Sequence, residues 1–296
     1  EKAAAAFARL RSFPKHAKAV DAAVNEALVQ QALGNAKEAI SALQLRLRIG
    51  KADRDAREAR VVMALLLVST DPKAAAEAFE AAADGLTQSD GLRVEALAAA
   101  GHAWLRLGTR KARQRAAATF EKALTVTEYV MGRSNSPAQK AFRGHKARAA
   151  LGKLMLYADR LSHKLKPKRP LTAKTQAELS RLTEGVVFWE DVGWSVCAEA
   201  VEAGLYARAG ADEAARTRAA AALLRAQKKG VFNDCVHDLL ALARRLHKGA
   251  PPAAKTVDWH HLAPPLKATT TVYDDPQNMD AMRVRAHELL TQNKPR

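Results

Sequence analysis

The sequence contains few groups of residues whose types and spacing could support catalysis or bind a metal. Cys235-Val236-His237 is the one Cys/His cluster, and because Cys197 lies far away in the sequence, the four ligands of a zinc site are not supplied. The adjacent histidines His260-His261 have suitable side chains for a metal, but solvated or interface histidines explain such a pair more simply. Glu190 and Asp191 are neighbouring carboxylates, yet adjacent residues on a helix point about 100° apart and do not converge on one substrate.

Known sequence signatures of catalysis are also missing. There is no Walker A loop, no dinucleotide-binding glycine fingerprint, no nucleophile elbow and no zincin helix. Two cysteines are too few for a disulfide framework, so reduced thiols are the simpler interpretation. The longest apolar run, residues 61–68, is much shorter than the roughly 18–20 residues of a transmembrane helix. The sequence therefore predicts a protein that is not an enzyme and has no cofactor, metal site or transmembrane segment.

The formal net charge of +17 is concentrated in one quarter of the chain. Residues 103–174 hold 18 Lys and Arg residues and three acidic residues, whereas residues 1–102 and 175–296 each carry a net charge of +1. This asymmetry is typical of a surface that contacts an anionic partner: nucleic acid, an anionic membrane face or an acidic protein. The alternative is a solvated charge run, but a uniformly basic protein would not be near neutral on both flanks.

Phosphate binding by this region would be independent of nucleotide sequence, because Lys and Arg act by releasing condensed counterions. The aromatic residues of the region occupy packing positions, so we expect contact with the backbone and shape of an RNA, without base readout. Anionic lipid is the other ligand of the same chemistry. The candidate contact residues are Arg110, Lys111, Arg113, Arg115, Lys146, Lys153, Arg160, Lys164, Lys166, Lys168 and Arg169.

One long basic helix is predicted over residues 137–165. Six apolar residues share one face of the helical wheel, namely Leu151, Leu154, Met155, Ala158, Leu161 and Leu165. A stripe away from that face is expected to be exposed and consists of Lys146, Lys153, Arg160 and Lys164. Residues 164–170 are polybasic and contain two prolines, which end the helix and predict an exposed, stiff loop.

The composition favours helix throughout the chain. Ala supplies 65 residues, aromatic residues supply 15, and Gly supplies 15. Ala loses no side-chain entropy in a helix, whereas a β-sandwich or barrel needs more β-branched and aromatic residues, so the fold class is predicted to be all-α. Helix-pair periodicity, broken near the middle by turn residues that include Gly34, Pro72, Gly108 and Gly210, recurs over residues 20–49, 54–83, 92–130 and 198–226.

These segments resemble degenerate tetratricopeptide repeats, which pair antiparallel helices and place small residues where the helices cross closely. The match to the family's first helix is Gly101, Trp104 and Gly108; the match to its second helix is Ala116, Phe120 and Ala123, repeated as Ala75, Phe79 and Ala82. The sequence departs from the family in a basic insertion at a turn, residues 110–115, and in the missing closing Pro. The resemblance covers about half of the chain. It implies a right-handed solenoid of helical hairpins, with repeat packing by Phe79, Gly101, Trp104, Gly108, Phe120 and Tyr206.

Four parts of the chain are predicted from these patterns. They are helical hairpins over 1–130, the basic helix and polybasic loop over 131–174, further helical hairpins over 175–248, and an extended Pro-rich tail with a short terminal helix over 249–296. The segment 2–20 carries five basic and no acidic residues in an Ala-rich setting that begins at Glu1, not at Met, which resembles the surroundings of an organellar targeting segment. We therefore expect a mitochondrial protein on the matrix side.

The functional hypothesis is a non-catalytic scaffold subunit of a large organellar complex, in which the repeats contact other protein subunits. A mitochondrial ribosome is favoured, with the basic face on rRNA. An accessory subunit of a respiratory or ATP synthase complex, with that face on lipid headgroups or acidic subunits, is the first alternative. A free peptide-binding adaptor and an RNA-processing or translation factor are further alternatives.

Overall fold

The computed structural model describes residues 1–13, 18–49, 54–68, 70–84, 86, 91–127, 136–165, 169–231 and 234–247. Within these ranges all regular secondary structure is α-helical, so the all-α prediction is confirmed. None of the helices in this part of the chain combines the length and the apolar character needed to cross a membrane. The predicted residues Lys166 and Lys168, and the predicted tail 249–296 with its terminal helix, lie outside the described residues.

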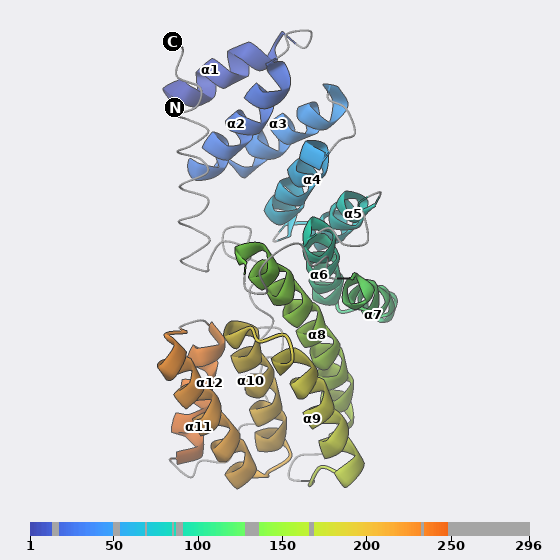
Figure 1. The fold of residues 1–296 in the computed structure, drawn as a ribbon, viewed down its shortest axis with the longest axis vertical. Helices are drawn as coiled ribbons and strands as arrows, with labels where there is room; N and C mark the ends of the chain where they lie inside the picture. Colours follow the sequence, from blue (N-terminus) through green and yellow to red (C-terminus); the bar gives the residue numbers. More distant parts are fainter. Residues whose placement is uncertain are drawn as a thin grey trace.

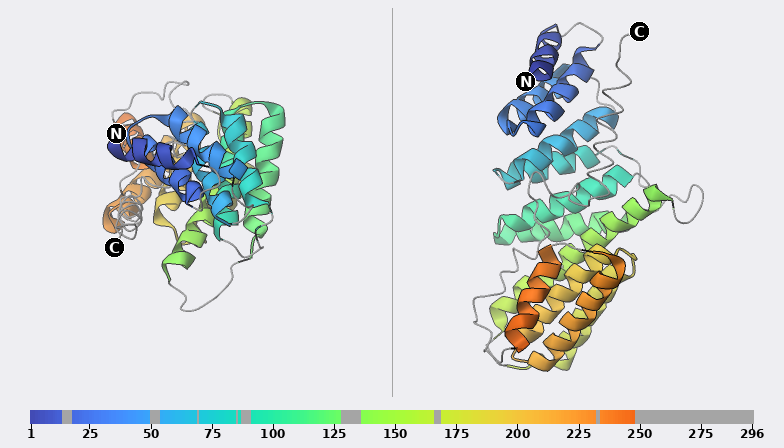
Figure 2. Two further views of the ribbon diagram at one scale, coloured as in Figure 1. Left: turned by 90° about the horizontal axis from the view of Figure 1, so that it is seen from above. Right: turned by 90° about the vertical axis from the view of Figure 1, so that its left-hand side faces the viewer.

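The described residues before 128 form seven helices that pack against one another in sequence order. They are α1 (Lys2–Arg11), α2 (Ala19–Ala32), α3 (Ala36–Ile49), α4 (Arg54–Leu67), α5 (Pro72–Ala83), α6 (Gly91–Arg106) and α7 (Arg110–Thr125). Figures 1 and 2 show these helices following one another along the long axis of the molecule.

The later helices are α8 (Pro137–Lys164), α9 (Ala173–Val187), α10 (Val192–Arg208), α11 (Asp212–Lys229) and α12 (Asp234–His247). Helix α8 agrees closely with the long helix predicted over 137–165. It packs against α6 and α7 and also against α9 and α10, so it joins the earlier helices to the later ones (Figure 1).

Three clusters of buried apolar side chains follow this arrangement. The first lies between α2, α3 and α4, the second extends from α4 to α8, and the third extends from α8 to α12. Helix α8 contributes Phe142 and Leu156 to the second cluster, and Leu151 and Leu154 to the third. It therefore buries apolar residues on two sides, whereas the sequence analysis predicted one apolar face.

Local signals set the ends of several helices where they were predicted. The Asp71 carboxylate accepts a hydrogen bond of 3.0 Å from a backbone N–H in the first turn of α5, where Pro72 also lies. Gly34 and Gly108 occupy the turns after α2 and α6 with φ values of 80° and 64°, a conformation that is unfavourable for residues with a Cβ. The predicted breaks at these positions are confirmed.

The basic residues 110–115 are helical, so their prediction as a turn insertion is wrong. Thr109 caps α7 by accepting a 3.2 Å hydrogen bond from the backbone N–H of Ala112. Ala112 and Ala116 are buried in the core. The cap and the buried alanines continue the helix directly through the charged run.

The interpretation of the two cysteines as reduced thiols is also wrong, because Cys197 and Cys235 form a disulfide. Their Cα atoms lie 5.2 Å apart, although 38 positions separate them in the sequence. Cys197 belongs to α10 and Cys235 to α12, and these two helices pack together. Tertiary structure thus joins two residues that sequence distance gave no reason to pair.

Candidate anionic-partner interface

Helices α7 and α8 lie side by side and run in opposite directions. Arg113 Nε is 2.9 Å from Asp159 Oδ2, and Lys153 Nζ is 2.7 Å from Glu121 Oε2. As the chain advances along α7, the paired position on α8 moves back toward its start. The N-terminal end of α7 therefore meets the C-terminal end of α8.

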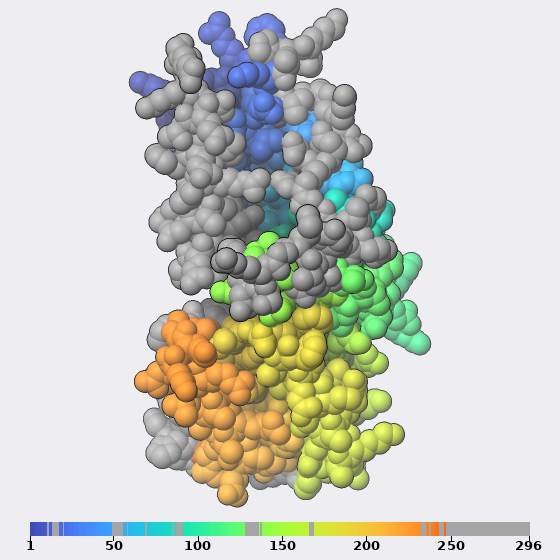
Figure 3. Space-filling model, viewed as in Figure 1, coloured from blue at the N-terminus to red at the C-terminus, as the bar shows by residue number. Residues whose placement is uncertain are grey.

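Four predicted contact residues lie at these two helix ends. Arg110 and Lys111 begin α7, and Arg160 and Lys164 lie in the last turns of α8; all four side chains are exposed. We call these four residues the α7–α8 basic surface. None of them forms an ion pair with any residue in the described part of the chain. Figure 3 shows green atoms of α7 at the right-hand edge of the molecule.

The described acidic residues of the basic region 103–174 are already engaged by cations. Glu121 pairs with Lys153, and Asp159 lies 2.9 Å from Arg113 and 3.5 Å from Nε2 of His163. The described carboxylates of the basic region are thus occupied, and they leave the charge of the α7–α8 basic surface unneutralised.

Two further predicted contact residues take part in contacts within the protein. Arg115 turns toward α5, where it pairs with Glu80 at 3.0 Å, and its guanidinium lies 4.0 Å from the ring centroid of Trp104. Lys153 remains at the surface, because its side chain is 37% exposed and that of its partner Glu121 is 60% exposed. An exposed pair of this kind contributes little stability. Arg169, after α8, is exposed.

Lys146 does not belong to an exposed stripe, which corrects the sequence-based prediction. Its side chain is buried, and its ammonium donates hydrogen bonds to the backbone carbonyls of Leu124, at 2.6 Å, and Val126. These carbonyls lie at the C-terminal end of α7, where helix carbonyls lack intrahelical partners and a positive charge is favourable. Lys146 therefore caps α7 and is not available to an external anion.

Arg148 is a second buried cation of α8, and the sequence analysis missed it. It is among the largest fully buried side chains, and its Nε and Nη2 atoms have no hydrogen-bond partner in the described residues. Its guanidinium lies 5.9 Å from the ring centroid of Trp194, on α10. The burial follows from the position of α8 between α6 and α10, which covers it on two sides.

Three titratable groups around Arg148 have shifted pKa values. Burial raises the pKa of Glu95 to about 7, partly offset by the positive charge of Arg148. Burial lowers the pKa of His145 to about 4 and the pKa of His102 to about 3, and the charge of Arg148 acts in the same direction. Both histidines are therefore neutral near pH 7, and the ring of His102 donates from Nε2 to the carbonyl oxygen of Arg148 at 3.0 Å.

Replacing Glu95 by Gln is expected to remove a pH-dependent loss of stability. Because the folded state raises the pKa of Glu95 from 4.5 to about 7, its contribution is fully present below pH 4.5 and is lost as the pH rises through 7. A shift of this size corresponds to roughly 3 kcal/mol. Urea denaturation of the wild type and Glu95→Gln between pH 4 and pH 8 should show their difference in unfolding free energy changing by this amount. A difference that does not vary with pH would contradict the burial of the carboxyl group.

The predicted repeat-packing residues lie in the interior or at turns. Phe79 and Phe120 are fully buried, and Trp104 is buried with its Nε1 donating to Glu80 at 2.9 Å. Tyr206 is buried in α10, with the guanidinium of Arg218 at 5.3 Å from its ring centroid. Gly108 is the turn residue described above. Gly101 lies directly against the ring of Phe120. Gly152 of α8, which was not predicted from the sequence, lies against the same ring.

Within the described ranges, no group of three or more His, Cys, Asp or Glu side chains is placed to hold a metal ion. Comparison of the chain with protein-family models, curated proteins and solved structures gives no match.

Proposed function

We propose that the protein is a non-catalytic helical-repeat scaffold subunit of a large mitochondrial assembly, folded as a tetratricopeptide-like solenoid of helical hairpins. In this proposal the α7–α8 basic surface binds an anionic partner, and the rRNA of a mitochondrial ribosome is the favoured one. The observation that carries the proposal is the unneutralised charge of Arg110, Lys111, Arg160 and Lys164, beside carboxylates that other cations already occupy.

RNA suits this surface for two physical reasons. Exposed Lys and Arg side chains bind phosphates by releasing counterions, which requires no base recognition. The two arginines can also make paired hydrogen bonds to phosphate oxygens. The helical pairs that pack in sequence order support the repeat interpretation, and the basic, acid-free segment 2–20 supports the mitochondrial location.

The disulfide favours a second candidate function. Disulfides persist mainly in oxidising compartments, so the pairing of Cys197 with Cys235 does not fit a reducing matrix well. An accessory subunit of a respiratory or ATP synthase complex, located where thiols are oxidised, would fit it better. In that case the α7–α8 basic surface would contact anionic lipid headgroups or acidic subunits.

Charge reversal of the α7–α8 basic surface is expected to weaken RNA binding without unfolding the protein. The variant is Arg110→Glu, Lys111→Glu, Arg160→Glu and Lys164→Glu combined, which leaves the buried Lys146 intact. Binding to a structured RNA, measured by fluorescence anisotropy at several salt concentrations, should weaken by at least about tenfold and depend less steeply on salt. Helical circular dichroism should not change.

A matched control reverses four exposed lysines on other helices, namely Lys37, Lys73, Lys228 and Lys229. Equal loss of RNA binding in both variants would show that net charge, and not this surface, is responsible. Sedimentation of the tagged protein from extract separates the two candidate functions. Migration with a heavy particle that RNase abolishes supports a ribonucleoprotein; RNase-resistant migration that depends on mild detergent supports a membrane complex.

A further inference from the structure

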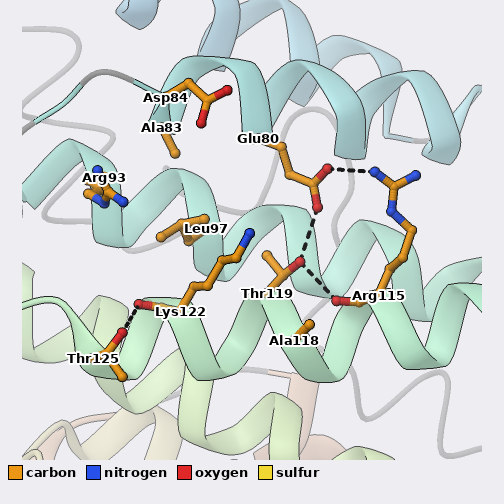
Figure 4. Close-up of a pocket in the computed structure, with 10 residues that line it drawn as sticks. All are labelled: Glu80, Ala83, Asp84, Arg93, Leu97, Arg115, Ala118, Thr119, Lys122 and Thr125. Carbon is orange, nitrogen blue, oxygen red and sulfur yellow. Dashed lines mark hydrogen bonds and ion pairs between the residues drawn. The ribbon is translucent and has the colours of Figure 1, made fainter.

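A pocket of about 450 Å³ lies on another part of the molecule, between α5 and α7. Figure 4 shows α6 behind it, between the two helices that form its walls. Ala83, Leu97 and Ala118 supply apolar lining, one from each helix. The remaining lining is polar and contains three cations and two carboxylates.

One of these carboxylates has its hydrogen-bonding capacity satisfied within the protein. Glu80 accepts hydrogen bonds from Trp104 Nε1 at 2.9 Å and from Thr119 Oγ1 at 3.1 Å through one oxygen, and pairs with Arg115 at 3.0 Å through the other. Figure 4 shows the contacts of Glu80 with Thr119 and Arg115 at one end of the pocket. The charges of Glu80 and Arg115 therefore neutralise each other, and the two side chains form one wall of the pocket.

The two other cations of the pocket are not matched in this way. Arg93 uses Nη1 to donate to the carbonyl oxygen of Leu86 at 2.6 Å, but its buried Nε has no hydrogen-bond partner in the described residues. Lys122 extends from α7 across the pocket (Figure 4), and its ammonium forms no ion pair within the described part of the chain. Asp84, at the end of α5, is the other carboxylate that lines the pocket.

We propose that this pocket binds an acidic side chain carried by a short peptide segment of a partner protein. The carboxylate would lie between Arg93 and Lys122, and the aliphatic part of the segment would rest on Ala83, Leu97 and Ala118. Asp84 would accept a hydrogen bond from a backbone N–H of the segment. The inference goes beyond the proposed function, because it concerns a protein contact on other residues than the α7–α8 basic surface.

The charges favour a carboxylate over a phosphate backbone. With Glu80 neutralised by Arg115, Arg93 and Lys122 together exceed Asp84 by one positive charge, which a single carboxylate balances and a polyanion would exceed. The apolar lining also suits an aliphatic stem and would leave a nucleic acid backbone without partners. Charge-assisted hydrogen bonds from both cations would supply most of the specificity.

The test uses two pools of terminally blocked heptapeptides that differ only at the central residue, Glu in one and Gln in the other. The flanking positions are randomised among Ala, Leu, Val and Ser, so no single sequence has to be guessed. The disulfide-bonded full-length chain is immobilised, and bound peptides are quantified by mass spectrometry. Enrichment of the Glu pool over the Gln pool is expected to be about tenfold, since charge-assisted hydrogen bonds are roughly twice as strong as neutral ones.

Arg93→Gln and Lys122→Gln are each expected to reduce this enrichment toward equality. Lys122 is exposed, so its variant should fold even if loss of the Arg93 contact to Leu86 destabilises the protein. The charge-reversed α7–α8 variant should keep the full enrichment, which separates a failure here from a failure of the proposed function. Equal binding of the two pools, unchanged enrichment in Lys122→Gln, or displacement of the peptides by tripolyphosphate at constant ionic strength would each overturn the proposal.

Discussion

Replacement of Phe120 by Ala is expected to lower the free energy of unfolding by about 3–5 kcal/mol, because it removes a fully buried ring from the meeting point of three helices. The ring extends from α7 into the space beside Gly101 of α6 and Gly152 of α8, and it makes an edge contact with His102 at a centroid distance of 5.0 Å. Few atoms could move into the space left behind, since the surrounding helices already pack closely. Urea denaturation followed by circular dichroism measures the loss.

Gly152→Ala tests the same contact from the opposite side. A Cβ at Gly152 would overlap the Phe120 ring, so the substitution should destabilise the wild type by about 1–3 kcal/mol. In the Phe120→Ala background the methyl group enters free space, and the gain of about 1 kcal/mol in helix propensity should make the substitution neutral or stabilising. A cost for Gly152→Ala that is the same in both backgrounds would show that the ring does not pack against α8.

The helix ends and the predicted repeat-packing residues of the N-terminal part could be inferred from the sequence. Asp71 followed by Pro72 is an N-terminal capping signal that depends on two adjacent residues, and Gly108 supplies the left-handed turn that a helical hairpin requires. The recurrence of Phe79 and Phe120 at matching helix positions likewise predicted two buried rings, and both are fully buried. The capping and turn signals are contained in one or two turns of chain, and the two buried rings follow from a pattern that recurs between two segments.

The burial of α8 on two sides could not be predicted from the sequence in the same way. A helical wheel shows which residues share a face, but it does not show that helices cover the opposite face as well. Lys146 was therefore assigned to solvent, although α7 lies over it and accepts its hydrogen bonds. The sequence did contain two signals. Phe142, Ala149 and Leu156 recur every seven residues on the second side of the helix. Gly152 lies inside the helix, where glycine is unfavourable unless a neighbouring side chain approaches closely.

The pairing of the cysteines likewise depends on tertiary structure, and it leads to the second large expected effect. Cys197→Ala combined with Cys235→Ala is expected to lower the free energy of unfolding by about 4 kcal/mol, because the disulfide closes a loop of 38 residues and restricts the unfolded chain. Ala is preferred to Ser because both positions are buried and a hydroxyl there would need a partner. The melting temperature should fall by about 6–8 °C.

Reduction of the wild type supplies the matched control, since dithiothreitol should reproduce the loss without any substitution. The double-alanine variant should melt at the same temperature with and without the reductant. Hydrogen exchange should locate the change in α12, which the disulfide ties to α10 and which otherwise depends on a single apolar face for its attachment. Two alkylatable thiols in the unreduced, denatured wild type, together with a melting temperature that dithiothreitol leaves unchanged, would contradict the disulfide. These results would also remove the argument for an oxidising compartment and would favour the ribosomal subunit over the accessory subunit of a membrane complex.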